Sequence, residues 1–151
     1  MIVITRTNLT AEAGRLLIDA LNTELAGAYP EPGATHFGLK PDEVSGKRGA
    51  FLVIYQAGTP VGCGAVNPST GELKRMYVAP AARGMGLGRR LVAALEAEAR
   101  ALGARRLILE TGIRQTAALA LYRATGFQPI PLYGEYLLSP ATSICLGKDL
   151  G

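Results

Sequence analysis

A glycine-rich turn between a predicted strand and a predicted helix constrains this chain more than any other feature. Apolar residues alternate as in a strand up to Val78, and Pro80 ends that strand. Glycine follows at positions 84, 86 and 88, so no Cβ atoms keep an anion away from the backbone N–H groups. The first amides of a helix lack partners and carry partial positive charge, so segment 72–90 predicts a pyrophosphate site.

Three phosphate-binding motifs fit such a turn to different degrees. The Walker pattern G-x-x-x-x-G-K-[ST] is absent from the chain, which removes P-loop nucleotide hydrolysis. The dinucleotide fingerprint G-x-G-x-x-G begins at Gly84, with Glu110 near the position of a ribose acid, but Arg89 replaces its third glycine. The pattern Arg-x-x-Gly-x-Gly is complete and consists of Arg83, Gly86 and Gly88.

This complete pattern, together with a second motif, resembles the GNAT family of acyl-CoA N-acetyltransferases. The second motif is segment 115–127, which is similar to the family's Asn-x-x-Ala-x-x-Leu-Tyr-x-x-x-Gly-Phe. The two motifs occur in family order, and the resemblance covers roughly residues 51–150. One departure is Gln115 in place of Asn, which puts the amide that would bind the cofactor on a longer side chain.

The resemblance implies an N-acetyltransferase that moves an acetyl group from acetyl-CoA to a primary amine by direct transfer. The backbone N–H of Met76 would stabilise the oxyanion. The resemblance implies cofactor contacts along the central strand, the glycine turn and the second motif, at Met76, Tyr77, Val78, Arg83, Gly84, Met85, Gly86, Leu87, Gly88, Arg89, Gln115 and Ala118.

Acetyl transfer needs a base for the ammonium proton and an acid for the departing thiolate. Glu72 begins the central strand, where the family often carries its general-base glutamate, although a solvated acid at a strand end is the alternative. Tyr122 matches the tyrosine of the second motif, and the resemblance makes it the general acid. Core packing alone would also accept an aromatic residue there.

The acceptor site is expected where the long segment 29–49 meets the loop near residue 135. The long segment contains several prolines and glycines, with one short helical turn expected near residues 41–45, and in the resembled family it covers the acceptor. His36 lies in it and is interpreted as a surface or substrate-shaping residue. The predicted walls are Tyr29, Tyr133 and Tyr136, with Glu135 attracting the ammonium group; a plain tyrosine-bearing loop is the alternative. The sequence does not distinguish an amino acid, a polyamine, an aminoglycoside and a protein amine as acceptors.

Periodicity predicts the remaining elements. A first strand at 2–6 precedes a helix at 11–26, capped by Thr10, whose apolar stripe comprises Leu16, Leu17, Ala20, Leu21 and Leu25. The helix after the glycine turn ends at Gly103 and pairs Glu96 with Arg100. Further predicted elements are strands at 49–56, 61–66, 105–110, 128–133 and 143–147 and a helix at 115–125.

This order predicts the α/β class, with a mixed and mostly antiparallel sheet of six to seven strands and helices on both faces. The central strand and strand 105–110 are joined by a helix, so they are expected to be parallel neighbours. In the resembled family these two strands splay apart, and the pantetheine arm of the cofactor lies in the gap.

Composition limits the remaining possibilities. The 151 residues suit a single domain, 1–151, and the chain has neither an eighteen-residue apolar run nor a signal-like N-terminus, which predicts a soluble, cytoplasmic protein without membrane contact. The net charge is +4, and its arginines are dispersed rather than clustered with aromatics, which favours a polyphosphate cofactor over nucleic acid. Cys63 and Cys145 have no metal-ligand spacing, so they are expected to be buried and no metal is expected.

The expected acceptor is a small-molecule or peptide amine, and the expected assembly is a monomer or homodimer. Two other functions compete with acetyl transfer. The first is a non-catalytic acyl-CoA sensor, against which the presence of both Tyr122 and Glu72 argues. The second is a nicotinamide dinucleotide oxidoreductase, which Arg89 in the fingerprint disfavours.

Overall fold

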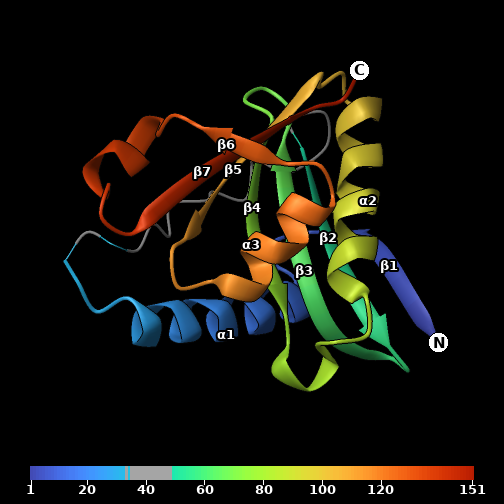
Figure 1. Cartoon of the computed structure of the whole chain (residues 1–151). Coiled ribbons are helices and arrows are strands. Elements are labelled where there is room, and N and C mark those ends of the chain that lie inside the picture. Colours follow the sequence, from blue (N-terminus) through green and yellow to red (C-terminus); the bar gives the residue numbers. More distant parts are fainter. Residues whose placement is uncertain (33, 35–48) are drawn as a thin grey trace.

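The computed structural model of the chain describes residues 1–32, 34 and 49–151 and has a seven-stranded sheet covered by helices (Figure 1). The helical turn expected near residues 41–45 and the position of His36 lie outside the described residues. In chain order the elements are β1 (Ile2–Thr7), α1 (Glu12–Ala28), β2 (Ala50–Gln56), β3 (Thr59–Asn67), β4 (Glu72–Val78), the 3-10 helix η3 (Pro80–Ala82), α2 (Leu87–Ala101), β5 (Arg106–Gly112), α3 (Thr116–Ala124), β6 (Gln128–Ile130), the 3-10 helix η4 (Gly134–Leu138) and β7 (Ser143–Asp149).

The sheet order is β1-β2-β3-β4-β5-β7-β6, and only β4 and β5 pair in parallel within the described sheet. The predicted mixed, mostly antiparallel sheet is therefore confirmed, and so is its central parallel pair. A doubly wound parallel sheet, which the dinucleotide fingerprint requires, is not the observed architecture.

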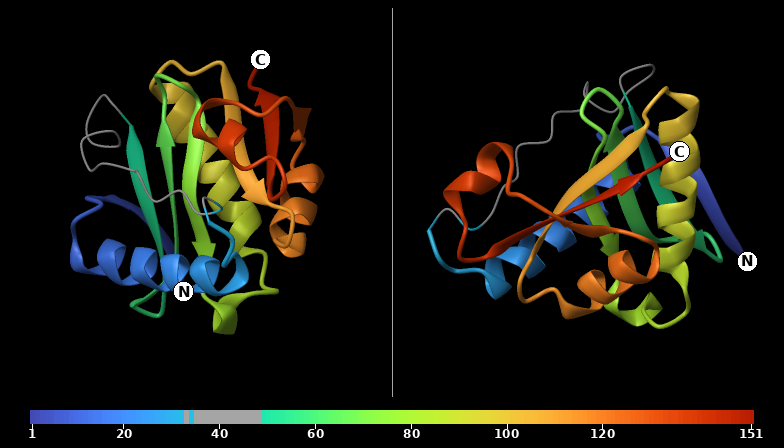
Figure 2. Two further views of the ribbon diagram at one scale, coloured as in Figure 1. Left: turned by 90° about the vertical axis from the view of Figure 1, so that its left-hand side faces the viewer. Right: turned by 45° about the horizontal axis from the view of Figure 1, so that its top comes forward.

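The two long helices lie on opposite faces of the sheet, as the left panel of Figure 2 shows. On one face Leu17 and Leu21 of α1 pack with Phe51 and Val53 of β2. On the other face the leucine stripe of α2 is buried against the sheet, with α3 beside it; Leu91 and Leu95 are at most 1% exposed. Helices on both faces of the sheet are thus confirmed, with α1 on one face and α2 and α3 on the other.

The parallel strands separate soon after they meet. Their described pairing consists of Glu72 with Ile108 and Leu73 with Leu109, at the start of β4. The register between β3 and β4 also shifts between Cys63 and Ala65, and Arg75 at this bulge has a φ of 57°. The bulge bends β4, so the half of β4 after Leu73 diverges from β5.

Two local predictions at α1 are wrong. Thr10 does not cap the helix, because its N–H and hydroxyl both donate to Oδ1 of Asn8, and Ala11 occupies the N-cap position without a side-chain cap. Leu16 is not in the apolar stripe but is 57% exposed. A Cβ at Gly14 would lie 2.9 Å from the ring of Phe51, so α1 approaches the sheet along Gly14 and Leu17, and Leu16 falls off that line.

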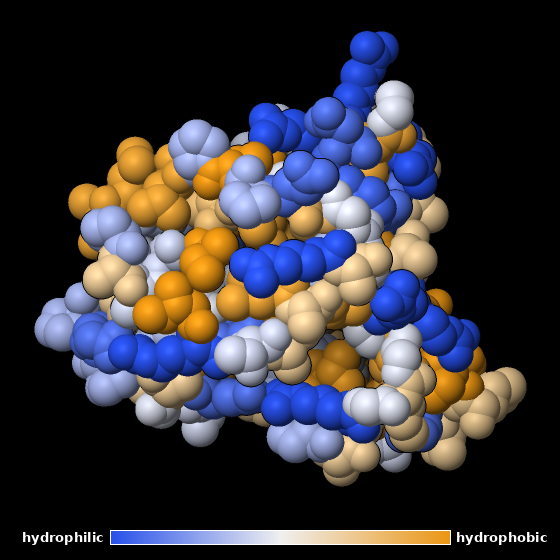
Figure 3. Space-filling view, in the orientation of Figure 1, coloured by the Kyte–Doolittle hydropathy of each residue, from blue (hydrophilic) through white to orange (hydrophobic). Residues whose placement is uncertain are grey.

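The C-terminal part of the sheet is shorter than periodicity suggests. β6 ends at Ile130 rather than near residue 133, because Pro131 has no N–H to continue the ladder. The chain then enters η4, which turns Tyr136 inward and leaves Leu137 and Leu138 61% and 82% exposed. Figure 3 shows hydrophobic surface at the end of the molecule where Figure 1 places the segment between β6 and β7. Among the described helices, none combines the length and apolarity that crossing a bilayer requires.

Candidate active site

Two adjoining cavities lie where β4 leaves β5. The larger cavity, about 290 Å³, is bounded by α1, the second half of β4, the N-terminal end of α2 and α3. The smaller cavity, about 120 Å³, is bounded by the C-terminal end of α1, the middle of β4, the end of β5, α3 and η4. Both cavities are lined by Leu21, Met76, Gln115, Ala118 and Tyr122. The two cavities therefore meet at a common wall of β4 and α3.

Tyr122 lies at this common wall, near the C-terminal end of α3. Its ring packs edge-on against Phe127 at 5.6 Å between centroids, and the residue is only 5% exposed. Burial raises the pKa of the Tyr122 phenol well above its ordinary value of 10, and the negative charge of Glu110 raises it further. The hydroxyl therefore stays protonated at neutral pH, which a proton donor requires.

Glu110, in the second half of β5, is a candidate site residue that the sequence reasoning did not assign to acetyl transfer. Its carboxylate lines the smaller cavity, and Oε2 accepts a hydrogen bond of 2.7 Å from Oγ of Ser143. Burial raises the pKa of Glu110 above 4.5, an effect that the Ser143 hydrogen bond opposes and the charges of Glu72 and Glu135 increase. The sequence signal that could have identified it is an acidic residue at the end of the predicted strand 105–110, which is otherwise apolar in its second half.

Glu72, the predicted base, lies at the start of β4 and is held by two of the predicted acceptor tyrosines. Its Oε2 accepts hydrogen bonds from the hydroxyls of Tyr133 at 3.1 Å and Tyr136 at 2.8 Å. The two rings meet edge to face, with 5.2 Å between centroids. Burial raises the pKa of both phenols well above 10, and the Glu72 charge raises it further. Of these three, only Tyr136 belongs to the described lining of the smaller cavity.

Tyr29 forms another wall of the smaller cavity. Its hydroxyl accepts a hydrogen bond of 2.8 Å from the backbone N–H of Arg114, and the Arg114 guanidinium lies 5.0 Å from its ring centroid. A Cβ at Gly112 would lie 1.9 Å from the Tyr29 hydroxyl oxygen, so only glycine admits the ring here. Glu135, the fourth predicted acceptor residue, is more exposed, and its carboxylate lies 3.8 Å from the Lys74 ammonium.

The larger cavity includes half of the predicted cofactor-binding residues. Its described lining contains Met76, Tyr77, Val78, Arg83, Gln115 and Ala118. The Arg83 guanidinium donates to the backbone carbonyl of Val78 at 2.8 Å and to both carboxylate oxygens of Glu24 at 2.9 and 3.0 Å. Arg83 therefore links the end of β4 to α1 at the edge of this cavity.

The glycine turn lies outside the described lining, at the N-terminus of α2. Gly84 and Gly86 have φ values of 83° and 76°, and a Cβ at either position would meet no atom within 4 Å. A Cβ at Gly88 would instead lie 2.9 Å from Cδ2 of Leu121, so Gly88 lets α2 approach α3 closely. Leu87 is buried in the core at 3% exposure, whereas Met85 is 48% exposed and Arg89 is also exposed.

The described residues offer the groups of acyl-transfer chemistry rather than those of a metal centre. No group of three or more His, Cys, Asp and Glu side chains able to hold a metal occurs in residues 1–32, 34 and 49–151. Cys63 and Cys145 are buried, as predicted, and burial raises the pKa of the Cys63 thiol to about 12. A thiol with that pKa is not ionised at neutral pH and is a poor nucleophile.

Comparison with known proteins places this arrangement in a family. The model of the acetyltransferase (GNAT) family matches residues 15–127. A protein of Azospirillum brasilense named IAA acetyltransferase is 41% identical over 157 residues, covering 99% of this chain and 98% of that protein.

Solved structures agree with the sequence comparison. A presumed acyl-CoA N-acyltransferase from Klebsiella pneumoniae superposes with a TM-score of 0.85 at 35% identity, covering 100% of this chain and 99% of that chain. A GNAT family acetyltransferase from Elizabethkingia anophelis with acetyl-CoA bound superposes with a TM-score of 0.69 at 18% identity, covering 98% and 97%, and at that identity it supports the fold alone. The predicted family resemblance is confirmed, and this chain belongs to the GNAT family of acetyl-CoA-dependent N-acetyltransferases.

Proposed function

We propose that this acetyltransferase moves the acetyl group directly from acetyl-CoA to an amine, at the wall that the two cavities share. The observation that carries the proposal is that Met76, Gln115, Ala118 and Tyr122 line both cavities. A thioester at the end of the larger cavity would therefore face an amine in the smaller one. Direct transfer requires such contact and no covalent acyl-enzyme.

The larger cavity suits the pantetheine arm of acetyl-CoA. β4 pairs with β5 only up to Leu73 in the described register, so the backbone of residues 76–78 faces the gap. The amides of an extended arm could pair with that backbone as an added strand would. The open space over Gly84 and Gly86 at the N-terminus of α2 suits the pyrophosphate, with Arg83, Met85, Gly88 and Arg89 nearby in sequence.

We assign the base to Glu110 and keep Glu72, the residue predicted from the sequence, as the alternative. An amine of pKa near 10.4 must lose a proton before it attacks, and a carboxylate can accept it directly or through water. Glu110 lines the smaller cavity, whereas Oε2 of Glu72 already accepts two phenol hydrogen bonds. Glu72 would then fix Tyr133 and Tyr136 as walls for the acceptor.

Tyr122 is the proposed acid, and the backbone N–H of Met76 is the proposed donor to the oxyanion. The thioester of acetyl-CoA supplies the acetyl group. The carboxylate first takes a proton from the ammonium group, and the neutral amine nitrogen then bonds to the carbonyl carbon. As the carbon–sulfur bond breaks, the Tyr122 hydroxyl protonates the leaving thiolate, and the second proton of the amine nitrogen restores the phenol. Burial keeps the Tyr122 phenol protonated but also makes it a weaker acid, so it gives up its proton only while negative charge develops on the sulfur.

The acceptor is a small-molecule or peptide amine, with Tyr29 and Tyr136 as walls and Glu135 at the more exposed side. That the chain is one domain over 1–151, that it acts as a monomer or homodimer without nucleic acid, and that it works in the cytoplasm stay predictions from composition and charge.

The test is release of free thiol from acetyl-CoA with a panel of amino acids, polyamines, aminoglycosides and peptides, and with IAA because of the relative's name. We expect turnover with at least one amine, and a kcat about ten- to a thousandfold lower for Tyr122→Phe, with the acetyl-CoA Kd changed less than about threefold. Tyr55→Phe on β2, outside the described cavity linings, is the control and should match the wild type. Acetyl-CoA binding without turnover would favour the sensor alternative, and an unchanged kcat for Tyr122→Phe with a slow amine would make Tyr122 a packing residue.

A further inference from the structure

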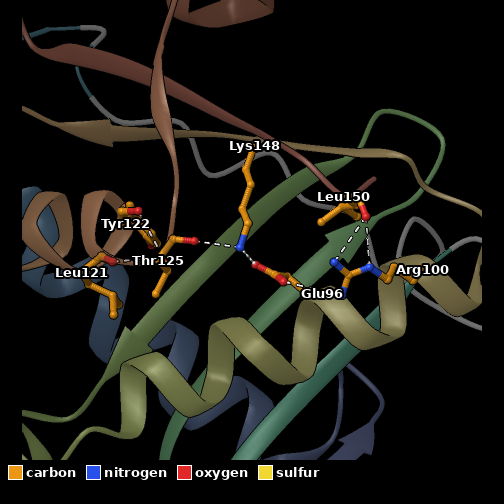
Figure 4. A network of polar contacts seen from close by, with 7 residues as sticks. All are labelled: Glu96, Arg100, Leu121, Tyr122, Thr125, Lys148 and Leu150. Carbon is orange, nitrogen blue, oxygen red and sulfur yellow. Dashed lines mark hydrogen bonds and ion pairs between the residues drawn. The ribbon is translucent and has the colours of Figure 1, made fainter.

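Lys148 of β7 connects the C-terminal end of α3 to α2, as Figure 4 shows. Its ammonium donates a hydrogen bond of 2.7 Å to the backbone carbonyl of Thr125 and also contacts a carboxylate oxygen of Glu96. The other oxygen of Glu96 lies 3.7 Å from the Arg100 guanidinium, which donates to the backbone carbonyl of Leu150. These residues lie outside the described lining of both cavities.

Thr125, whose carbonyl Lys148 holds, is also the C-cap of the helix that carries Tyr122. The Thr125 hydroxyl donates to the backbone carbonyls of Leu121 at 3.0 Å and Tyr122 at 3.1 Å. The carbonyl of Tyr122 accepts a further bond of 2.9 Å from the N–H of Phe127. The turn that presents Tyr122 is therefore fixed at the residue that Lys148 binds.

The contact of Lys148 with the end of α3 matters more for the position of this helix than the Lys148–Glu96 ion pair matters for the stability of the fold. α3 has nine residues, and helices of that length are marginal in water without tertiary contacts. An ammonium at a helix C-terminus also interacts favourably with its carbonyls. By contrast, a partly buried ion pair such as Lys148 with Glu96 generally adds little to stability compared with apolar packing. Its contribution is to the fixed placement of α3.

We propose that Lys148, oriented by Glu96, is a positioning residue that holds the last turn of α3 so that the Tyr122 hydroxyl faces the shared wall of the two cavities. The proposal rests on the role of Tyr122 in the proposed function and adds a residue that acts through Tyr122. Lys148 itself does not touch the substrate, and it moves no proton. Its removal should lower the rate of the chemical step and leave cofactor binding nearly unchanged.

A double-mutant cycle separates positioning from a general structural role. Lys148→Met should lower kcat about tenfold when Tyr122 is present, which corresponds to about 1.4 kcal/mol, and less than about threefold in the Tyr122→Phe background. Lys148→Arg keeps the charge and can reach both partners, so it should restore kcat to within about threefold of the wild type. The acetyl-CoA Kd should stay within about threefold in every variant.

Glu98→Gln is the matched control for the loss of a carboxylate from α2. Glu98 forms an ion pair with Arg6 at 3.5 Å and does not contact α3. The variant should leave kcat unchanged. If Lys148→Met proves insoluble, Glu96→Gln tests the same point, since it removes the counter-charge and should show the same dependence on Tyr122.

Equal losses of kcat with and without the Tyr122 hydroxyl, or no loss at all, would overturn the positioning role and leave that of Tyr122 standing. A failure of the proposed function looks different, because Tyr122→Phe alone would then be as active as the wild type. In that case the positioning proposal is wrong as well.

Discussion

At the scale of single residues, two glutamates near the proposed reaction centre differ in what surrounds them. Glu72 accepts hydrogen bonds from the hydroxyls of Tyr133 and Tyr136, which keep its Oε2 engaged. Glu110 accepts one hydrogen bond, from Ser143, and burial makes its charge costly. A base benefits from that second environment, because a raised pKa brings a carboxylate closer to the working pH.

The pH dependence of the reaction should identify the base. Because burial raises the pKa of Glu110 above 4.5, kcat/KM should fall as the pH drops through a pKa above that value. Glu110→Gln should abolish this limb and lower kcat/KM by about 10²- to 10⁴-fold. Glu72→Gln is the matched comparison and should retain the limb. If instead Glu72→Gln alone abolishes it, the sequence-based assignment of the base is correct.

The pH dependence of protein stability is an independent test of the raised pKa of Glu110. The folded state, with the higher pKa, binds more protons than the unfolded state between the two pKa values. The contribution of Glu110 to stability is therefore present below pH 4.5 and is lost as the pH rises through the folded-state pKa. Melting curves of Glu110→Gln should show a Tm that gains on the wild type as the pH rises through this window.

At the scale of elements, the glycine turn combines an unusual backbone conformation with the predicted phosphate site. Gly86 is the N-cap of α2 with a φ of 76°, and Gly58 in the β2–β3 hairpin has a φ of 83°. Neither would place a Cβ within 4 Å of another described atom. The two glycines thus share the same backbone requirement, but only Gly86 stands at the predicted phosphate site.

Gly86→Val should therefore fold and lose most of its acetyl-CoA affinity, by more than about tenfold, because the strained backbone reorients the first amides of α2. Gly58→Val should lose a similar amount of stability, about 1–3 kcal/mol, with unchanged affinity. Denaturant unfolding and isothermal titration measure the two effects. A Gly86→Val variant with normal affinity would place the phosphates elsewhere.

Hydrophobic periodicity predicted the helices and strands of this fold more closely than it predicted bulges and helix caps. Leu87, Leu91 and Leu95 are buried as the stripe of α2 requires, and the predicted pair of Glu96 with Arg100 is present. The bulge at Arg75 had no signal, since a non-glycine residue with positive φ is not visible in a hydrophobic pattern. Asn8 competed with Thr10 for the polar groups before α1, and sequence alone did not rank the two.

At the scale of the whole molecule, the site exists because distant segments meet. Glu110 and Ser143 lie on neighbouring strands and form a hydrogen bond although they are 33 positions apart in the sequence. Glu72 and Tyr136 form one across 64 positions. The second motif located Tyr122 because a helix and its ending glycine are local features. The proposed role of Glu110 depends on its position in the lining of the smaller cavity. That cavity forms because β4 and β5 separate, which the sequence pattern does not reveal.

The central claim is that acetyl-CoA occupies the larger cavity between β4 and α3, and the most direct test is its effect on Tm in two variants of α3. Ala118 lines both cavities, so Ala118→Phe should fill the space, while Ala120→Phe adds the same ring at an exposed position of the same helix. Acetyl-CoA at a hundred times its Kd adds about 2.7 kcal/mol of stability, so the wild type and Ala120→Phe should show a clear rise in Tm, and NAD should produce none. Ala118→Phe, folded by its own melting transition, should show little or no rise with acetyl-CoA. An equal rise in all three proteins, or stabilisation by NAD instead, would contradict the account.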